Sequence, residues 1–242
     1  MPGADGLDLR GKAALVLGGS RGIGAAIVRV LADAGADVAF TYRGSEDAAR
    51  TLADAAPARA VRSDLGDRDD TRRTVAAMGP LDILVVSAGI NDLTPAPDQD
   101  PDIADRILDV NVRGPFHAAA VAGQTMREDG RIVFIGSVHG DRMPVAGCTA
   151  YAMTKSAVQG LTRGLARDLG PRGITVNTVQ PGPVDTEMNP EDGPMAEASH
   201  AMMAIKRHAA PGEVAALVAY LLRPEAAMIT GAMLTIDGGM GV

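Results

Sequence analysis

Short apolar runs alternate along this chain with longer stretches in which apolar residues recur at helical spacing. The runs predict strands because they are continuous and end in glycine or polar residues. The stretches between them predict helices, several of which close on glycine or proline. The predicted strands lie at 13–19, 36–42, 59–65, 81–89, 130–137, 173–182 and 231–239. The predicted helices lie at 22–35, 45–56, 68–78, 102–128 and 149–170, and Ser45 is expected to cap the second of them.

This alternation predicts an α/β fold. Strands separated by helices form parallel sheets with helices on both faces. The runs "ALVL", "ILVV" and "IVFI" fit strands that are buried on both sides. We therefore expect one Rossmann-type domain over residues 1–242, a doubly wound parallel sheet of seven strands. Within it, residues 181–205 interrupt the alternation, and segment 187–208 is expected to cover a substrate. Its methionines suit an adaptable apolar wall or a helix core.

Composition narrows the class of protein further. The 242 residues are 46% hydrophobic and carry a net charge of −7, with no basic block, so we expect no nucleic-acid polymer as a partner. A single cysteine, Cys148, cannot form an internal disulfide and fits the reducing cytoplasm. No apolar stretch is long enough for a membrane span, and residues 1–12 do not resemble a signal peptide. The histidines are scattered, so we expect isolated side chains and no metal site.

The stretch "VLGGSRGIG" joins the first predicted strand to the first predicted helix. Gly18, Gly22 and Gly24 would allow a tight turn whose backbone N–H groups face a ligand. A glycine-rich turn at the start of a helix is a site for phosphate groups. The strand–turn–helix context favours a pyrophosphate site over a simple turn.

The end of the second strand predicts which nicotinamide cofactor binds. An acidic residue there would select NAD(H) by binding the ribose hydroxyls. The sequence reads "FTYRGS", with Arg43 and no acid, and Arg21 belongs to the glycine turn. Two guanidinium groups would suit the 2′-phosphate of NADP(H). The alternative is that both are solvated surface arginines.

A second set of polar residues predicts acid–base chemistry. Tyr151 and Lys155 are four residues apart on a predicted helix and so share one face. An ammonium group beside a phenol is expected to lower the phenol pKa. Ser137 ends the fifth strand, where its hydroxyl would point into the ligand crevice or cap the strand end. Asn111 lies in an apolar helical stretch, either as a hydrogen-bond hub or as part of a proton-relay water site.

Taken in order, these motifs resemble the short-chain dehydrogenase/reductase (SDR) family over essentially the whole chain. The glycine turn, Asn111, Ser137, Tyr151-x-x-x-Lys155, "QPGPVDT" and "TGAMLTIDGG" carry the resemblance. It implies an NADP(H)-dependent reductase of a carbonyl, or of the C=N bond of an imine, acting on a small molecule. It also implies a homotetramer packed through 102–128 and 151–169.

The resemblance assigns roles residue by residue. Tyr151 is the general acid, Lys155 lowers its pKa and holds the nicotinamide ribose, Ser137 orients the carbonyl, and Asn111 positions a water. The implied cofactor-binding residues are Gly18, Ser20, Arg21, Gly22, Ile23, Gly24, Tyr42, Arg43, Asp64, Leu65, Ala88, Gly89, Tyr151, Lys155, Pro181, Gly182, Val184 and Thr186. Among these, Asp64 matches an acid that contacts adenine.

The chain departs from the family pattern in two places. Leu17 stands where the family has threonine, and "VSAG" replaces Asn-Asn-Ala-Gly after the fourth strand. In the family that threonine ties two strand ends by a hydrogen bond. We expect packing between Leu17 and Val86 to replace it.

Within the family, the segments "GSVHGDRMPVAG" and "AIKRH" are most similar to a biofilm-dispersal branch described as binding cyclic di-GMP, and the acyl-carrier-protein reductases are a looser match. The alternative function is therefore a nucleotide-binding regulator. Asp141, Arg142 and Lys206 would serve such a ligand, or they are solvated loop charges.

Overall fold

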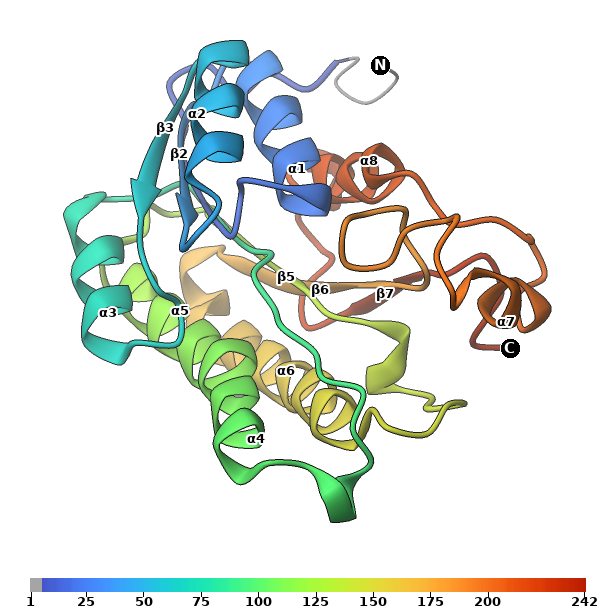
Figure 1. Ribbon diagram of the computed structural model, residues 1–242. Helices are drawn as coiled ribbons and strands as arrows, with labels where there is room; N and C mark the ends of the chain where they lie inside the picture. Colours follow the sequence, from blue (N-terminus) through green and yellow to red (C-terminus); the bar gives the residue numbers. More distant parts are fainter. Residues whose placement is uncertain (1–5) are drawn as a thin grey trace.

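The strands of this protein form one parallel sheet (Figure 1). The computed structural model describes residues 6–242. Residues 1–5, which belong to the predicted domain and to the stretch 1–12 that does not resemble a signal peptide, lie outside the described residues. The sheet has seven strands in the order β3-β2-β1-β4-β5-β6-β7. They are β1 (Ala13–Leu17), β2 (Asp37–Tyr42), β3 (Ala58–Arg62), β4 (Ile83–Val86), β5 (Arg131–Ile135), β6 (Thr175–Pro181) and β7 (Met233–Ile236). The predicted fold class is confirmed.

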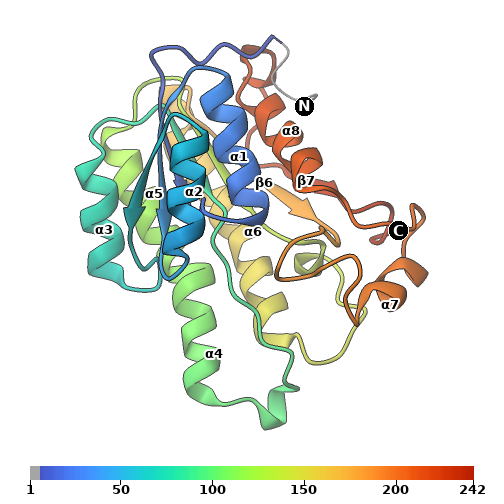
Figure 2. The same cartoon turned by 45° about the horizontal axis from the view of Figure 1, so that its top comes forward.

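Helices cover both faces of the sheet (Figure 2). One layer holds α1 (Gly22–Asp33), α2 (Glu46–Ala55) and α8 (Pro211–Leu221). The other holds α3 (Arg68–Ala77), α5 (Gly114–Thr125) and α6 (Thr149–Leu169). Two further helices, α4 (Pro101–Leu108) and α7 (Ala196–Ala201), extend from these layers. The central strands are apolar throughout because both of their faces are covered.

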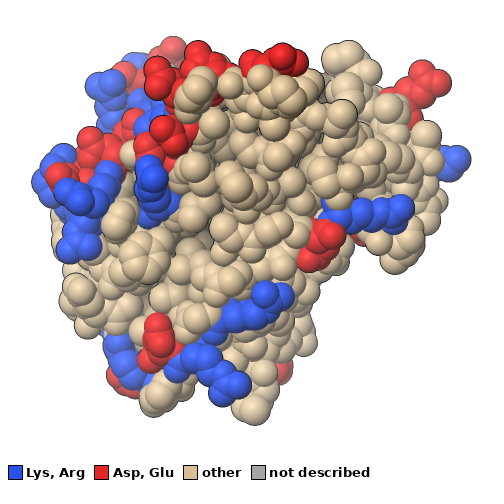
Figure 3. Space-filling model, turned by 90° about the horizontal axis from the view of Figure 1, so that it is seen from below, with Lys and Arg blue, Asp and Glu red and all other residues tan. Residues whose placement is uncertain are grey.

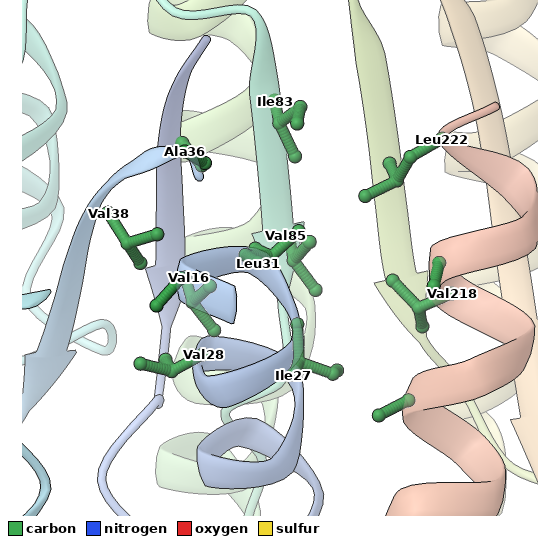
Figure 4. Close-up of a cluster of buried hydrophobic side chains, with 14 of the residues drawn as sticks. Val16, Ile27, Val28, Leu31, Ala36, Val38, Ile83, Val85, Val218 and Leu222 are labelled. Carbon is green, nitrogen blue, oxygen red and sulfur yellow. The ribbon is translucent and has the colours of Figure 1, made fainter. Parts of the chain in front are cut away.

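The packing of one layer explains why α8 forms. Figure 4 shows Val218 and Leu222 beside a cluster that includes Ile27, Leu31 and Val85. Burying several such side chains stabilises the fold by about 1.5–3 kcal/mol each. Helix α8 is not among the helices that the hydrophobic pattern predicts. Pro211 at its first turn, and Glu213 accepting the Ala210 N–H at 2.8 Å, are the start signals that could have revealed it.

The predicted helix 102–128 is interrupted. The chain forms α4, then a π-helical turn at Asp109–Arg113, then α5, which ends at Thr125. A π turn inserts one extra residue into the helical ladder and is frequent at functional sites. Asn111 lies in this turn, so the irregularity sets the direction of its side chain.

The two departures from the family pattern meet in the sheet. Leu17 and Val86 are register partners in β1 and β4, and both are buried in one apolar cluster. A hydrogen bond at this strand end comes instead from β2, because Gly18 N–H donates to Thr41 Oγ1 at 3.0 Å. The packing hypothesis is consistent with this arrangement.

Two smaller expectations are also answered. Ser45 stands at the N-cap of α2, but its side chain makes no capping hydrogen bond within the described part of the chain, so the predicted Ser cap is wrong. Among residues 6–242, no helix has the length and apolarity that crossing a bilayer requires.

Candidate active site

A cavity of about 790 Å³ lies at the carboxyl ends of the strands. Ligands of open α/β sheets bind in this position. All the residues predicted to bind the cofactor line the cavity, together with Ser137: Gly18, Ser20, Arg21, Gly22, Ile23, Gly24, Tyr42, Arg43, Asp64, Leu65, Ala88, Gly89, Tyr151, Lys155, Pro181, Gly182, Val184 and Thr186. Figure 3 views the side toward which β2 and β3 point in Figure 1, and much of the middle of this face carries no charged side chains.

The glycine turn leaves its backbone accessible. Gly18 has a φ of +80°, and a Cβ atom there would lie 2.6 Å from the backbone of Ala88. A Cβ atom at Gly24 would lie 2.1 Å from the carbonyl oxygen of Gly18. Only glycine fits at both positions. Helix α1 begins within this stretch, at Gly22, and the N–H groups of its first turn lack intrahelical partners. The turn therefore fits a pyrophosphate group.

Positive charge gathers where the second strand ends. Arg21 and Arg43 are both exposed and both line the cavity, with Tyr42 beside them. The first acid after the strand, Glu46, begins α2 and does not belong to the lining of the cavity among the residues described. The geometry therefore allows both guanidinium groups to face one anionic ligand.

Asp64 lines the cavity, but its carboxylate already has partners. Arg106 Nη2 donates to both carboxylate oxygens at 2.6 and 2.8 Å, and the Gly66 N–H donates at 2.9 Å. Partial burial works to raise the pKa of Asp64. The hydrogen bonds from Arg106 and Gly66, with the charge of Arg43, hold that pKa below its usual value. Asp64 is therefore an ionised carboxylate, and the sequence contained no sign that Arg106 shares it.

Tyr151, Ser137 and Lys155 converge in the cavity, as predicted. The Ser137 side chain hydrogen bonds to Tyr151 and accepts the N–H of His139 at 3.1 Å. The Lys155 Nζ lies 5.4 Å from the centre of the Tyr151 ring and donates to the carbonyl oxygen of Ile135 at 2.9 Å. The i, i+4 spacing on α6 thus places the amine below the phenol ring.

The predicted net lowering of the Tyr151 pKa is wrong for this arrangement, because burial dominates the shift. Burial raises the pKa of Tyr151 to about 12, although the hydrogen bond with Ser137 opposes the rise. Burial lowers the pKa of Lys155 to about 8. Burial disfavours the charged form of each group, so the two values move in opposite directions. At neutral pH Tyr151 holds its proton and Lys155 is mostly charged.

Asn111 is a hydrogen-bond hub, the first of the two roles considered for it. Its Nδ2 donates to the Ile90 carbonyl oxygen at 2.8 Å and to Thr154 Oγ1 at 3.1 Å, and its Oδ1 accepts the Ile90 N–H at 2.9 Å. Both donors of the amide are therefore used. Unlike the other three predicted catalytic residues, Asn111 does not line the cavity among the residues described. It connects α6 to the loop after β4.

Two residues beside Tyr151 were not predicted as part of the site. The ring of His139 lies edge-on to the Tyr151 ring at 6.2 Å between centres, and burial lowers the pKa of His139. Cys148 is buried and also lines the cavity. His139 is two residues after Ser137, so its place in the strand-end loop was the available signal.

The predicted covering segment forms one wall of the cavity. Met188, Met195 and Met202 line it, whereas Met203 packs against Val138 and Met240 in a small core cluster. The apolar-wall alternative therefore fits three of these methionines, whereas Met203 is buried in a core cluster beyond the end of α7. The short helix α7 belongs to this wall.

The residues considered for a cyclic dinucleotide do not converge on this cavity. Asp141 accepts hydrogen bonds from Gln159 and Gln180, and Arg142 donates to the Val242 carbonyl oxygen at 2.9 Å. Neither they nor Lys206 belong to the lining that the described residues form.

The expectation of isolated histidines is wrong for one pair. His200 Nε2 and His208 Nδ1 lie 2.8 Å apart, and their rings meet at 75°. His200 is on α7 and His208 follows it, so the turn between them folds one ring onto the other. They are eight positions apart, and the chain between them is irregular beyond the end of α7, so no local spacing rule could anticipate the pair.

Comparisons with known proteins agree with the predicted resemblance. Residues 18–241 match a family model described as enoyl-(acyl carrier protein) reductase. The chain is 57% identical over 231 residues to the cyclic-di-GMP-binding biofilm dispersal mediator protein of Escherichia coli (strain K12), covering 96% of this chain and 98% of that protein. It is 34% identical over 238 residues to the 3-oxoacyl-[acyl-carrier-protein] reductase MabA of Mycobacterium tuberculosis (strain ATCC 25618 / H37Rv), covering 96% and 93%. The crystal structure of BdcA in complex with NADPH has a TM-score of 0.95 at 56% identity, covering 97% of this chain and 96% of that chain.

Proposed function

Because this chain belongs to the short-chain dehydrogenase/reductase family, we propose that it reduces the carbonyl group of a small molecule to an alcohol, with Tyr151 as the proton donor. The chain is an NADP-dependent oxidoreductase, and the proposal concerns the substrate class and the mechanism. One observation carries it. A phenol that keeps its proton at neutral pH lies in the same cavity as a glycine cradle for pyrophosphate.

The cofactor would be held by the residues that the sequence predicts to bind it and that line the cavity. The turn from Gly18 to Gly24 would bind the pyrophosphate, and Arg21 and Arg43 would bind the 2′-phosphate. Ala88, Gly89 and the segment from Pro181 to Thr186 would enclose the rest. When bound, the cofactor supplies a hydride to the substrate carbon.

The polar groups of the chain supply the proton and orient the substrate. Ser137 donates a hydrogen bond to the carbonyl oxygen and holds that oxygen next to Tyr151. Tyr151 transfers its phenol proton to the same oxygen as negative charge develops there. The products are the alcohol, the oxidised cofactor and a phenolate that regains a proton from solvent. An imine would be reduced to an amine in the same geometry.

Lys155 acts as a charge beside the phenol. Its ammonium group stabilises the phenolate that proton transfer leaves behind, because the low-polarity interior strengthens their attraction. Asn111 acts as a positioning residue, since it holds the helix that carries both groups. This arrangement favours reduction over oxidation, since oxidation would need Tyr151 to lose its proton first.

The rate of reduction should depend on the charge of Lys155. The pKa of Lys155 is lowered to about 8, so the ammonium form predominates below that pH and the neutral amine above it. Tyr151 remains protonated throughout, because its pKa is about 12. We expect kcat/KM to be constant at neutral pH and to fall about tenfold per pH unit above pH 8. An initial-rate pH profile measures this, and a rate that instead rises toward pH 10 would contradict the assignment of the protonated phenol.

A substrate screen tests the proposed function as a whole. A panel of ketones, aldehydes and imines is offered with NADPH and, in parallel, with NADH, and cofactor oxidation is followed by absorbance. Turnover with NADPH on carbonyl compounds supports the proposal. The alternative, a nucleotide-binding regulator, is favoured by the name of the relative at 57% identity. Tight binding of cyclic di-GMP with no turnover on any compound would support that alternative instead.

The predicted homotetramer is supported by exposed apolar side chains on the helices assigned to subunit packing. Ile103 on α4, Phe116 on α5 and Met153 on α6 are exposed, and burial between subunits would remove them from water. Light scattering in solution measures the mass of the assembly and so tests the tetramer.

The single cysteine continues to fit the reducing cytoplasm.

A further inference from the structure

Three potential metal ligands meet in the covering segment, away from the proposed catalytic residues. They are Glu191, His200 on α7 and His208. One ligand atom from each lies within 4.8 Å of the other two. Two imidazoles and one carboxylate are the ligand types that zinc takes in sites with three protein ligands.

The contacts around His208 hold it in a position suited to coordination. His208 is almost fully buried, with 2% of its surface exposed. Its Nε2 lies 3.1 Å from Asn189 Nδ2, and its backbone N–H donates to Glu191 Oε1 at 3.2 Å. Metal-binding histidines usually bond their second ring nitrogen to a carbonyl or carboxylate group, which fixes the ring. A 180° rotation of the Asn189 amide would place its oxygen at that nitrogen, and His208 Nδ1 would then be left for a metal.

The distance between the two rings also fits. Nitrogen ligands of a tetrahedral zinc ion lie about 3.3 Å apart, because each Zn–N bond is about 2.0–2.1 Å. His200 Nε2 and His208 Nδ1 lie 2.8 Å apart, so a shift of about 0.5 Å would admit the ion. Glu191 is exposed and His200 is half-buried, so an ion has a path from solvent.

We propose that Glu191, His200 and His208 form a binding site for a divalent transition-metal ion of the zinc type. The site connects three parts of the covering segment. Ala209, next to His208, pairs with Val184 at the end of the cavity wall, and the Glu191 N–H donates to Asp185 Oδ1 at 3.0 Å. Ala198, Ser199 and Met202 of the cavity wall flank His200. The bound ion therefore fixes α7 against the frame of the cavity.

Metal binding is measured on chain without an affinity tag, after treatment with a chelator and dialysis. Zn²⁺ is titrated and quantified by mass spectrometry, and Co²⁺ is titrated as a spectroscopic probe because its visible absorption reports the ligand geometry. We expect one ion per chain and slower hydrogen exchange in 189–208 when Zn²⁺ is bound. Thermal unfolding should shift upward with the Zn²⁺ concentration, since a ligand that binds the native state stabilises it.

Matched variants assign the ligands. Glu191→Gln and His200→Gln should each weaken Zn²⁺ binding by about tenfold or more. Glu197→Gln, on α7 itself, and His117→Gln, on α5, should leave the affinity unchanged. Both ligand variants lie outside the buried core, so loss of folding is not expected, and circular dichroism checks it. The proposal is overturned if no ion binds near one per chain, or if both ligand variants bind as the native chain does. The histidines would then be only a hydrogen-bonded pair. Because the readout is metal affinity, these outcomes do not depend on the proposed reductase activity.

Discussion

Replacing Tyr151 with phenylalanine should lower the rate of carbonyl reduction by about a hundredfold to ten-thousandfold, the usual contribution of a general acid. The substitution removes one oxygen atom and leaves the ring that packs against His139. The proton that balances hydride addition must then come from water. NADPH binding should be unchanged, because the glycine turn and the arginines that would hold the cofactor are untouched. Initial rates and fluorescence titration of NADPH measure the two effects separately.

Tyr220→Phe is the matched control. Tyr220 lies exposed on α8, so the same chemical change there should leave the rate unaltered. If Tyr151→Phe turned over substrate at the native rate, Tyr151 could not be the proton donor. A native chain that bound NADPH but reduced no compound would point to the regulator alternative.

Removing the guanidinium group of Arg43 should weaken the binding of NADPH and spare that of NADH. Hydrogen bonds to charged groups contribute about 1.5–3 kcal/mol, so Arg43→Ala should raise the Kd for NADPH about tenfold to a hundredfold. Arg21→Ala should act in the same direction, and the double variant should bind the two cofactors with similar affinity. Calorimetric titration of each variant with NADPH and with NADH measures the ratio.

The control for this experiment is Arg50→Ala on the neighbouring helix α2. Arg50 is exposed and pairs with Asp47, outside the cavity lining. Arg50→Ala removes the same charge at a position that does not reach the cofactor, so the ratio of the NADPH and NADH affinities should not change. An equal loss of NADPH and NADH affinity in Arg43→Ala would show that Arg43 supports the fold of the turn and does not bind the 2′-phosphate. High salt should weaken the native preference for NADPH, since these charges are exposed.

The sequence was sufficient to predict the sheet and a set of residues that all line one cavity. Parallel strands that are buried on both faces appear as continuous apolar runs, so β1, β4 and β5 could be located from local pattern alone. The turn from Gly18 to Gly24 and the pair Tyr151 and Lys155 depend on spacings of a few residues. Such spacings fix backbone and side-chain directions within one element, whatever the rest of the fold does.

Other features depend on contacts between distant segments. Helix α8 is packed between the sheet and α1, and apolar residues occupy almost all of its faces. Its apolar residues therefore show little helical periodicity from which a helix could be predicted. Arg106 and Asp64 are 42 positions apart in the chain, and only the fold brings the guanidinium group to the carboxylate.

The electrostatics of the site also belong to the tertiary structure. The helix spacing placed Lys155 near Tyr151, but the pKa of each group depends on how completely other segments exclude water from it. The cluster of Glu191, His200 and His208 forms for a related reason, since an irregular segment brings its ends together only by packing on the sheet frame. The sequence alone determined the strands, most of the helices and which side chains share a face within an element. The tertiary structure alone decided which side chains meet across elements and how strongly burial shifts their charges, because both depend on the packing of residues far apart in the chain.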